Sequence, residues 1–385
     1  MKKFLMTISA GAMLLSAQAY DSFGAAFSAG QKALKKRDYE TAAKCFAEAH
    51  KLAQKPGNRC DALFYEGIVL CEANAISYDA NGGDVLAVGI EALAMLSRTP
   101  ETVHLIRPMR GGVISDFSVQ CEIITALLEL VCQNAVLRPN LIISVPSGLS
   151  RLERRTILDA AAVCGAARVC VLDAPIASAL GAGVSIEEPR GVLVIDIGAG
   201  TCDIAVITMG TVAFCRSIPI AGDDFDETIC QYLRQKRGIE IGLPTAQRLK
   251  HQIGCASPRE EEFEAAANGK DSIRQMPLQF FVTSTELCEA LAPRIDAIAQ
   301  AVLDVLEDVP PELFGDICET GVVLCGGSSA LYGLDAALHE KLRLPVRVAA
   351  DGAHCAAKGA GCALKSIDKL EDEGSLFRLK ERNKR

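Results

Sequence analysis

Residues 191–206 read GVLVIDIGAGTCDIAV, an apolar strand that runs into Asp196, a glycine-rich turn and Thr201 before a second apolar strand begins. This pattern predicts a β-hairpin that holds a phosphate group. Gly198 and Gly200 leave the turn backbone free to adopt positive φ, so that successive N–H groups can converge on an anion. Asp196 is placed to hold a Mg²⁺-bound water. An ordinary buried hairpin with a tight turn is the alternative interpretation.

Length and composition favour a large α/β protein. A chain of 385 residues with 50% apolar content is long enough for two domains, and at that size roughly three quarters of the unfolded surface is buried on folding. The net charge of −8 and the lack of a basic stripe with interleaved aromatic residues argue against nucleic acid as a partner.

The 16 cysteines are scattered through apolar runs and form no CxxC pair. This distribution favours buried free thiols in a reducing compartment over disulfides or a zinc site. The five histidines show no metal-ligand spacing and receive no role.

Several segments around the hairpin resemble the MreB family of bacterial actin homologues, in the family's order. They are GDVLAVGIEAL (83–93), RTPETVHLIRPMRGGVISDF (98–117), SRLERRTILDAA (150–161), IAGDDFDETI (220–229), TAQRLKHQIG (245–254) and GVVLCGGSSALYGLD (321–335). The resemblance covers about residues 67–371. It implies an actin-like α/β fold of two domains, ATP with Mg²⁺ as cofactors, and filaments that form by self-association beneath the inner membrane and work with the cell-wall synthesis machinery.

The first 66 residues do not belong to this resemblance. Residues 1–19 have the charged, apolar and small-residue parts of a secretory signal peptide, with an uncleaved membrane anchor as the alternative. Residues 20–66 are predicted to be helical, with one tetratricopeptide-like repeat or a plain amphipathic helical hairpin as the two interpretations. The predicted organisation is therefore 1–19, 20–66, a truncated actin-like first domain (67–188), a second domain (189–350), and a C-terminal helix with a basic tail (351–385).

The first domain is predicted to be truncated because the family's first phosphate hairpin is missing from the sequence before Gly67. The nearest candidate, DANGGD at 79–84, reads instead as a surface turn between two strands. Without the missing strands, the central sheet of this domain would have an unpaired edge unless the N-terminal helices cover it.

Hydrolysis is predicted to be impaired. MreB relatives carry an acidic residue that orients the attacking water directly before a proline, and here Ala174 precedes Pro175. Asp173 is adjacent, but side chains alternate faces along a strand, so it is expected to point away from the γ-phosphate. Losing a positioned base typically costs ~10²–10⁴ in rate.

The nucleoside side of the pocket is predicted from two further segments. A helix beginning near Ser329 follows a pair of glycines, and a second helix carries Gln247 where the family usually has Glu. Helix packing and solvated charge are the alternatives for both. Thr201 is the candidate catalytic residue, and Asp196 the candidate Mg²⁺ ligand through water. The resemblance implies cofactor contacts from Asp196, Gly198, Ala199, Gly200, Thr201, Gln247, Arg248, Lys250, Gly326, Gly327, Ser328 and Ser329.

Periodicity places most of the regular elements. Strands are predicted at 84–89, 141–146, 168–173, 191–196, 203–208, 211–218, 321–325 and 345–349, and helices at 118–135, 150–163, 224–236, 286–308 and 330–342. The acidic stretch 258–271 (PREEEFEAAANGKD) is predicted to be a solvated loop, and the basic tail 379–385 to be a solvated terminus that could touch anionic lipid.

Two functional interpretations follow. In the first, the chain is a cytoplasmic, inner-membrane-associated filament protein that maintains cell shape, binds ATP and hydrolyses it poorly. In the second, it is an exported, periplasmic interaction protein whose actin-like portion is non-catalytic. A fused or recombined gene product is a variant of both. The free thiols favour the first.

Overall fold

The structure, a computed structural model, divides the chain into two compact units, Met1–Glu72 and Ala73–Arg385. It describes residues 75–79, 83, 85–89, 91–92, 95, 99–131, 139–166, 168–365 and 377–378, all in the second unit. The predicted segments 1–19, 20–66 and 379–385 lie outside the described residues.

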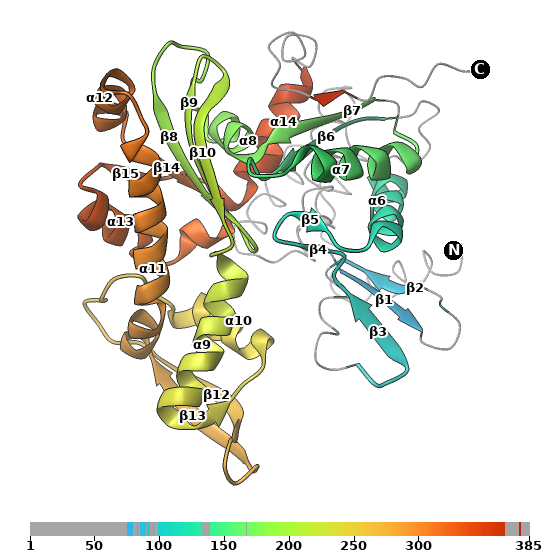
Figure 1. Ribbon diagram of the computed structural model, residues 1–385. Coiled ribbons are helices and arrows are strands. Elements are labelled where there is room, and N and C mark those ends of the chain that lie inside the picture. The colour runs from blue at the N-terminus through green and yellow to red at the C-terminus, as the bar shows by residue number, and fades with distance from the viewer. Residues whose placement is uncertain are drawn as a thin grey trace, which may run out of the picture. The chain divides into compact units, whose positions relative to one another are not determined.

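The largest sheet of the described chain has five strands in the order β10-β9-β8-β14-β15 (Figure 1). These strands are β8 (Val192–Ile197), β9 (Cys202–Thr208), β10 (Thr211–Ile218), β14 (Val322–Cys325) and β15 (Val346–Val348). β9 is antiparallel to β8 and β10, whereas β14 is parallel to β8 and β15. β8 therefore lies at the centre, with a partner strand on each side.

Helices cover both faces of this sheet, so β8 is buried along its whole length and is apolar except at Asp196. Leu193, Ile195 and Ile197 pack on one face, and Val192 and Val194 on the other. Figure 1 shows α11 on one side of the sheet and α8 with α14 on the other. The covering helices are α9 (Gly222–Arg237), α11 (Ser284–Glu307) and α13 (Leu334–Leu342) on the first face, and α8 (Ala174–Gly181) and α14 (Cys355–Lys365) on the second.

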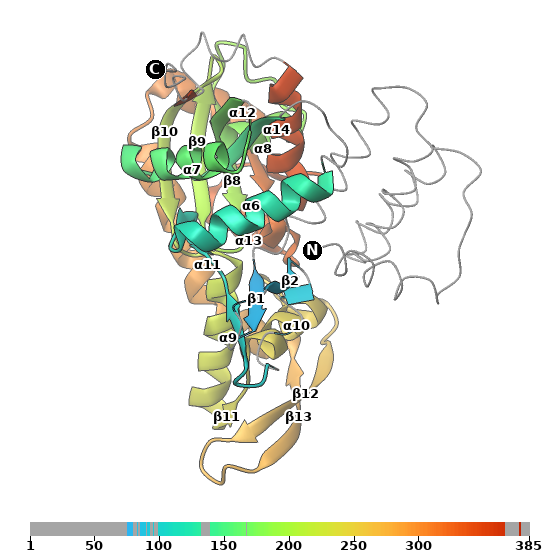
Figure 2. The ribbon, with the colours of Figure 1, turned by 90° about the vertical axis from the view of Figure 1, so that its right-hand side faces the viewer.

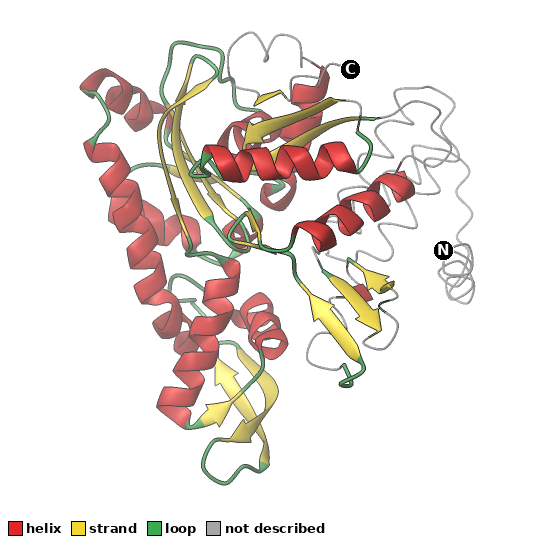
Figure 3. Ribbon diagram, turned by 45° about the vertical axis from the view of Figure 1, so that its right-hand side comes forward, coloured by secondary structure: helices red, strands yellow, loops and turns green. Residues whose placement is uncertain are grey.

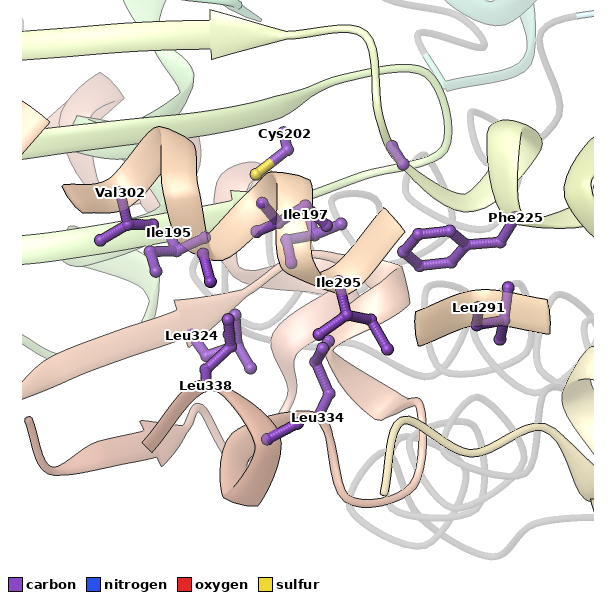
Figure 4. Packing of buried hydrophobic residues seen from close by; sticks show 14 of the residues in the cluster. Ile195, Ile197, Cys202, Phe225, Leu291, Ile295, Val302, Leu324, Leu334 and Leu338 are labelled. Atoms are coloured by element: carbon purple, nitrogen blue, oxygen red, sulfur yellow. The ribbon is translucent and has the colours of Figure 1, made fainter. Parts of the chain in front are cut away.

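The larger of the two cores lies between the sheet and α9, α11 and α13 (Figure 4). Phe225 of α9 is fully buried in it, together with Leu291 and Ile295 of α11. The helix predicted over 286–308 is confirmed, and its buried residues repeat at the spacing of one helix face. A capping box between Thr283 and Glu286 fixes the start of α11.

A second sheet, in the order β16-β7-β6, combines two strands that precede the hairpin in sequence with one short strand near the C-terminus. Its strands are β6 (Asn140–Val145), β7 (Arg168–Asp173) and the short β16 (Phe377–Arg378). β6 and β7 are parallel, and among the described strands β6 pairs with β7 alone. Two helices that pack on each other, α6 (Phe117–Val131) and α7 (Arg151–Val163), accompany this sheet (Figure 2).

Smaller strands complete the described first part. A sheet in the order β2-β1-β3 contains β1 (Ile76–Asp79), β2 (Val85–Val88) and β3 (Val103–Ile106), and a hairpin pairs β4 (Met109–Arg110) with β5 (Val113–Ile114). β1 and β2 are antiparallel neighbours. The prediction that residues 79–84 connect two strands of a hairpin is therefore confirmed.

The prediction of a loop over residues 258–271 is wrong for its second half. Residues Glu264–Asp271 form strand β12, which pairs with β13 (Pro277–Thr283) and with β11 (Ile239–Glu240) (Figure 3). Ala265 and Ala267 alternate toward the core, a signal that the surrounding acidic residues obscure. Helix α12 (Pro311–Thr320) is not predicted by the sequence analysis, and helix α10 (Leu243–Ile253) is expected there only from the family resemblance.

The buried ring of Phe225 gives a direct test of the larger core. Phe225→Ala is expected to lower the free energy of unfolding by about 3–5 kcal/mol, because it removes a fully buried aromatic side chain and leaves a cavity. Phe281, 59% exposed on β13, is the matched control, and Phe281→Ala is expected to change stability by less than about 1 kcal/mol. Chemical denaturation followed by circular dichroism measures both, and equal losses would contradict this packing.

Candidate functional site

The candidate site is built on the connection between β8 and β9. Asp196 lies directly opposite Asp203 in the antiparallel register, so both carboxylates are on the same face of the sheet. The Ser178 hydroxyl of α8 donates to Asp196 Oδ2, and the Thr201 hydroxyl donates to Asp203 Oδ2 at 3.1 Å. The candidate Mg²⁺ ligand and the candidate catalytic hydroxyl are thus both engaged by neighbouring side chains.

The turn itself differs from the prediction in its glycine conformations. Neither Gly198 nor Gly200 has positive φ. The turn is closed instead by the Gly198 N–H, which donates to the Thr201 carbonyl at 2.9 Å. Gly200 is required for another reason, because a Cβ there would lie 3.3 Å from the backbone nitrogen of Gly111 in the β4–β5 turn.

Three consecutive N–H groups of this turn, those of Ala199, Gly200 and Thr201, donate to no acceptor within the described part of the chain. The side chain of Ala199 is exposed, so this part of the turn reaches the surface. Buried or half-buried N–H groups are normally paired. Their availability at a glycine-rich turn is what an anion-binding site requires.

The carbonyl side of the same turn is held firmly. Gly198 O accepts from Ser328 Oγ at 2.8 Å and from the Gly222 N–H at 3.2 Å, and Ala199 O accepts from the Asp223 N–H at 2.7 Å. The N-terminus of α9 and the segment after β14 therefore meet at the turn. Of the predicted site residues, Ser328 and Gly198 are thus joined directly by a hydrogen bond.

Burial raises the pKa of Asp196 from 3.8 to about 6, with Asp203 adding to the rise and Ser178 opposing it. Burial also raises the pKa of Asp203, which is 3% exposed. Asp203 accepts from the Ser147 N–H at 3.3 Å and so joins the loop after β6 to the hairpin. Sequence reasoning missed Asp203, although its place in an otherwise apolar strand was the available signal.

The glycine pair after β14 lies against the base of the hairpin. Gly326 has φ 86°, and a Cβ there would overlap the Ile197 carbonyl and the Asp196 carboxylate. By contrast, a Cβ on Gly327 would meet no atom within 4 Å. The backbone beside Gly327 is therefore open to a ligand. Gly326, which has no Cβ, allows the chain to lie directly against Ile197 and Asp196.

The helix predicted to begin near Ser329 starts later. Gly327–Ala330 form a short 3₁₀ helix, η2, and α13 begins at Leu334. Ser329 Oγ donates to Gly326 O at 2.6 Å, a local hydrogen bond that competes with a regular helix start. Gly333 then takes the left-handed conformation before α13. The four residues from Gly326 to Ser329 thus face the site from a tight turn.

The three candidate cofactor-binding residues on α10 make different contacts. Lys250 Nζ binds Asp226 Oδ1 at 2.8 Å and Gly222 O at 2.6 Å, so it supports the N-terminal end of α9. Burial raises the pKa of Asp226 to about 6, and Lys250 opposes this rise. Arg248 donates to the Ala266 carbonyl of β12 at 3.3 Å, and Gln247 is exposed. Only Lys250 connects to the hairpin, through Gly222.

The position before Pro175 carries no carboxylate near the hairpin. Ala174 begins α8, and Asp173, at the end of β7, is paired with Arg154 of α7. Burial raises the pKa of Asp173 while Arg154 lowers it. The neighbouring carboxylate is thus committed to an ion pair within its own domain.

The described residues hold no cluster of three His, Cys, Asp or Glu side chains arranged to bind a metal ion. Within the same residues, no helix is both long enough and apolar enough to cross a membrane.

A central sheet with an acidic phosphate-type hairpin, flanked by a second domain, is the arrangement of actin-like proteins. The crystal structure of MreB5 of Spiroplasma citri bound to AMPPNP resembles this chain with a TM-score of 0.73 and 31% sequence identity, over 78% of this chain and 91% of that one. The chain therefore has an actin-like α/β fold.

Comparison of the sequence with known proteins identifies the family. The family model described as MreB/Mbl protein matches residues 62–372. Cell shape-determining protein MreB of Escherichia coli K12 is 42% identical over 309 residues, which cover 79% of this chain and 89% of that protein. Cell shape-determining protein Mbl of Bacillus subtilis is 39% identical over 306 residues, covering 79% and 92% respectively. The chain belongs to the MreB/Mbl family, which confirms the resemblance found in the sequence.

The two glycines after β14 allow a matched test of the site's backbone. Gly326→Ala is expected to destabilise the nucleotide-free protein by at least about 1–3 kcal/mol, because alanine is strained at φ 86° and its methyl group overlaps Ile197. Gly327→Ala is expected to stay within about 0.5 kcal/mol. Urea denaturation of both variants measures the difference, and a neutral Gly326→Ala would disprove the close approach.

The buried carboxylate of Asp196 predicts a pH dependence of stability. Between pH 3.8 and about 6 the folded protein retains a proton on Asp196 that the unfolded chain has released. The stability contributed by that proton is lost as pH rises through this window. The free energy of unfolding is expected to fall by about 3 kcal/mol across the window.

Asp196→Asn cannot lose this proton, and its amide oxygen still accepts from Ser178. The stability of Asp196→Asn relative to wild type is therefore expected to rise between pH 4 and pH 7. Denaturation midpoints at both pH values measure it. A difference that does not change with pH would show that Asp196 ionises normally.

Proposed function

We propose that the chain is a cytoskeletal filament protein of cell-shape maintenance that binds ATP with Mg²⁺ at the β8–β9 hairpin and hydrolyses it poorly. Membership of the MreB/Mbl family supports the cell-shape role, since the relatives it matches are cell-shape-determining proteins. The nucleotide complexes of Spiroplasma citri MreB5 with AMPPNP and ADP support nucleotide binding.

The observation that carries nucleotide binding is the set of three N–H groups at Ala199, Gly200 and Thr201 that have no acceptor among the described residues. They suit a phosphate group at the tip of the hairpin. Gly326 and Gly327 would supply bare backbone for the nucleoside side, and Ser328 would hold the turn through Gly198. Gln247 and Arg248 would reach the nucleoside only from the exposed side of α10.

Asp196 is the residue that would hold Mg²⁺ through a bound water. Its carboxylate is buried and one oxygen accepts from Ser178, which leaves the second oxygen for water. When bound, the cation would neutralise phosphate charge. It would also favour the ionised carboxylate, whose pKa is otherwise raised to about 6.

Poor hydrolysis is proposed because the position before Pro175, where the family resemblance expects a water-orienting acid, carries no carboxylate. Ala174 has only a methyl group, and Asp173 is paired with Arg154. Thr201, the candidate catalytic residue, donates its hydroxyl proton to Asp203. Asp203 in turn is held by the Ser147 N–H, so neither group is placed as an unencumbered base.

The same proposal includes two domains, 67–188 and 189–350, and self-association into filaments. It also includes a cytoplasmic location at the inner membrane surface and contact with cell-wall synthesis enzymes. Family membership supports them. The apolar side chains exposed on the β12–β13 hairpin, among them Ile273 at 88% and Met276 at 62%, support a surface that associates with protein.

The test is ATP titration with and without Mg²⁺, followed by pelleting of the full chain. Wild type is expected to bind ATP and to sediment in its presence. Asp196→Ala is expected to weaken Mg²⁺-dependent ATP binding at least tenfold, and the solvent-facing Glu261→Ala is expected to leave it unchanged.

Phosphate release is expected to stay near background in wild type and to rise little in Ala174→Glu. Unchanged ATP affinity in Asp196→Ala would make the hairpin structural, and brisk phosphate release by wild type would disprove impaired hydrolysis.

A further inference from the structure

The second domain and the first domain contain close pairs of cysteine thiols that the nucleotide site does not use. All twelve cysteines of the described residues are free thiols. Six of them lie as three neighbouring pairs: Cys121 with Cys164, Cys255 with Cys288, and Cys325 with Cys355. Members of each pair are far apart in sequence, so only the fold brings them together.

The pairs differ in access. Cys325 and Cys355 are completely buried between the main sheet and α14, and Cys255 is 1% exposed. Cys121 on α6 and Cys164 at the C-terminal end of α7 are both partly exposed. Of the three described pairs, this is the one in which both cysteines are partly exposed.

The geometry of this accessible pair is defined by two further contacts. Cys164 Sγ donates to the Cys121 carbonyl at 3.2 Å, and Cys121 Sγ donates to the Ala160 carbonyl at 3.8 Å. Each thiol is thus held against the helix that carries the other. Cys121 and Cys164 are therefore neighbours across the contact between α6 and α7.

We propose that Cys121 and Cys164 form a reversible disulfide by exchange with a small-molecule disulfide such as oxidised glutathione. Cys164, as thiolate, attacks one glutathione sulfur, which forms a mixed disulfide and releases one glutathione thiolate. Cys121 then loses its proton and attacks the Cys164 sulfur, which releases the second glutathione. Two protein thiols are oxidised, one glutathione disulfide is reduced to two thiols, and no other reactant is needed.

The order of attack follows from the surroundings of Cys121. Burial raises the pKa of this thiol to about 11, and contact with Cys164 adds to the rise. The thiolate is the attacking species in disulfide exchange, so Cys121 is the poorer first nucleophile and acts as the resolving thiol. Formation is correspondingly slow, as suits a bond that responds to a sustained change in redox conditions.

The bond would act on the first domain. It would connect α6 to the end of α7 and close residues 121–164, a loop that contains β6 and all of α7. Restricting the unfolded chain in this way stabilises the folded state. The same loop includes Ser147, which bonds Asp203, so the cross-link would stiffen the part of the first domain that contacts the hairpin.

The experiment incubates the folded full chain with excess oxidised glutathione, blocks the remaining thiols with iodoacetamide, and maps the non-reduced digest by mass spectrometry. A peptide pair joined through Cys121 and Cys164 is expected, with Cys325 and Cys355 still alkylated only after unfolding. The melting temperature is expected to rise and to return on addition of dithiothreitol.

Variants separate this bond from other oxidation. Cys121→Ser and Cys164→Ser are each expected to abolish the reversible rise in melting temperature, whereas Cys215→Ser, which removes an exposed unpaired thiol on β10, is expected to retain it. Absence of the 121–164 cross-link in folded wild type would overturn the proposal. So would equal oxidation of the buried 325–355 pair, because access would then not decide which pair reacts.

Discussion

The described structure depends on one constraint, a carboxylate at the end of a strand that is buried on both faces. β8 is enclosed by β9 and β14 within the sheet and by helices above and below it. Asp196 is the single charged side chain of that strand, and it is accommodated by the Ser178 hydroxyl of α8. Burying a carboxylate is costly unless it is hydrogen-bonded or protonated, and its raised pKa expresses that cost. A cation bound beside this carboxylate would offset the cost of burying it.

In the turn after β8, the backbone carbonyls and the backbone N–H groups have different roles. Its carbonyls bind Gly222, Asp223 and Ser328, so the start of α9 and the segment after β14 are fixed against it. Its N–H groups at Ala199, Gly200 and Thr201 are left without acceptors in the described chain. Rigid support on one side and open donors on the other make the turn suited to an anion without a large rearrangement.

Asp203 joins the loop after β6 to the β8–β9 hairpin. Asp203 receives the Ser147 N–H from the first domain and the Thr201 hydroxyl from the hairpin. Asp173, which could have substituted for the missing acid, is bound to Arg154. The loop after β6 is therefore joined to the hairpin through Asp203, and both Asp203 and Asp173 have hydrogen-bonded or ionic partners.

Local sequence determined the elements whose signals are short-range. All eight predicted strands are present with ends within one residue. For β8, β9 and β14 the reason is that strands buried on both faces read as continuous apolar segments. The start of α11 follows from its capping box. Tertiary structure alone decided features that require distant groups: β12, whose alternation is hidden by acidic neighbours, the delayed start of α13, the ordinary φ of Gly198 and Gly200, and the pairing of Lys250 with Asp226. The contact of Cys121 with Cys164 belongs to the same group, because a sequence records the spacing of residues but not which helices pack together.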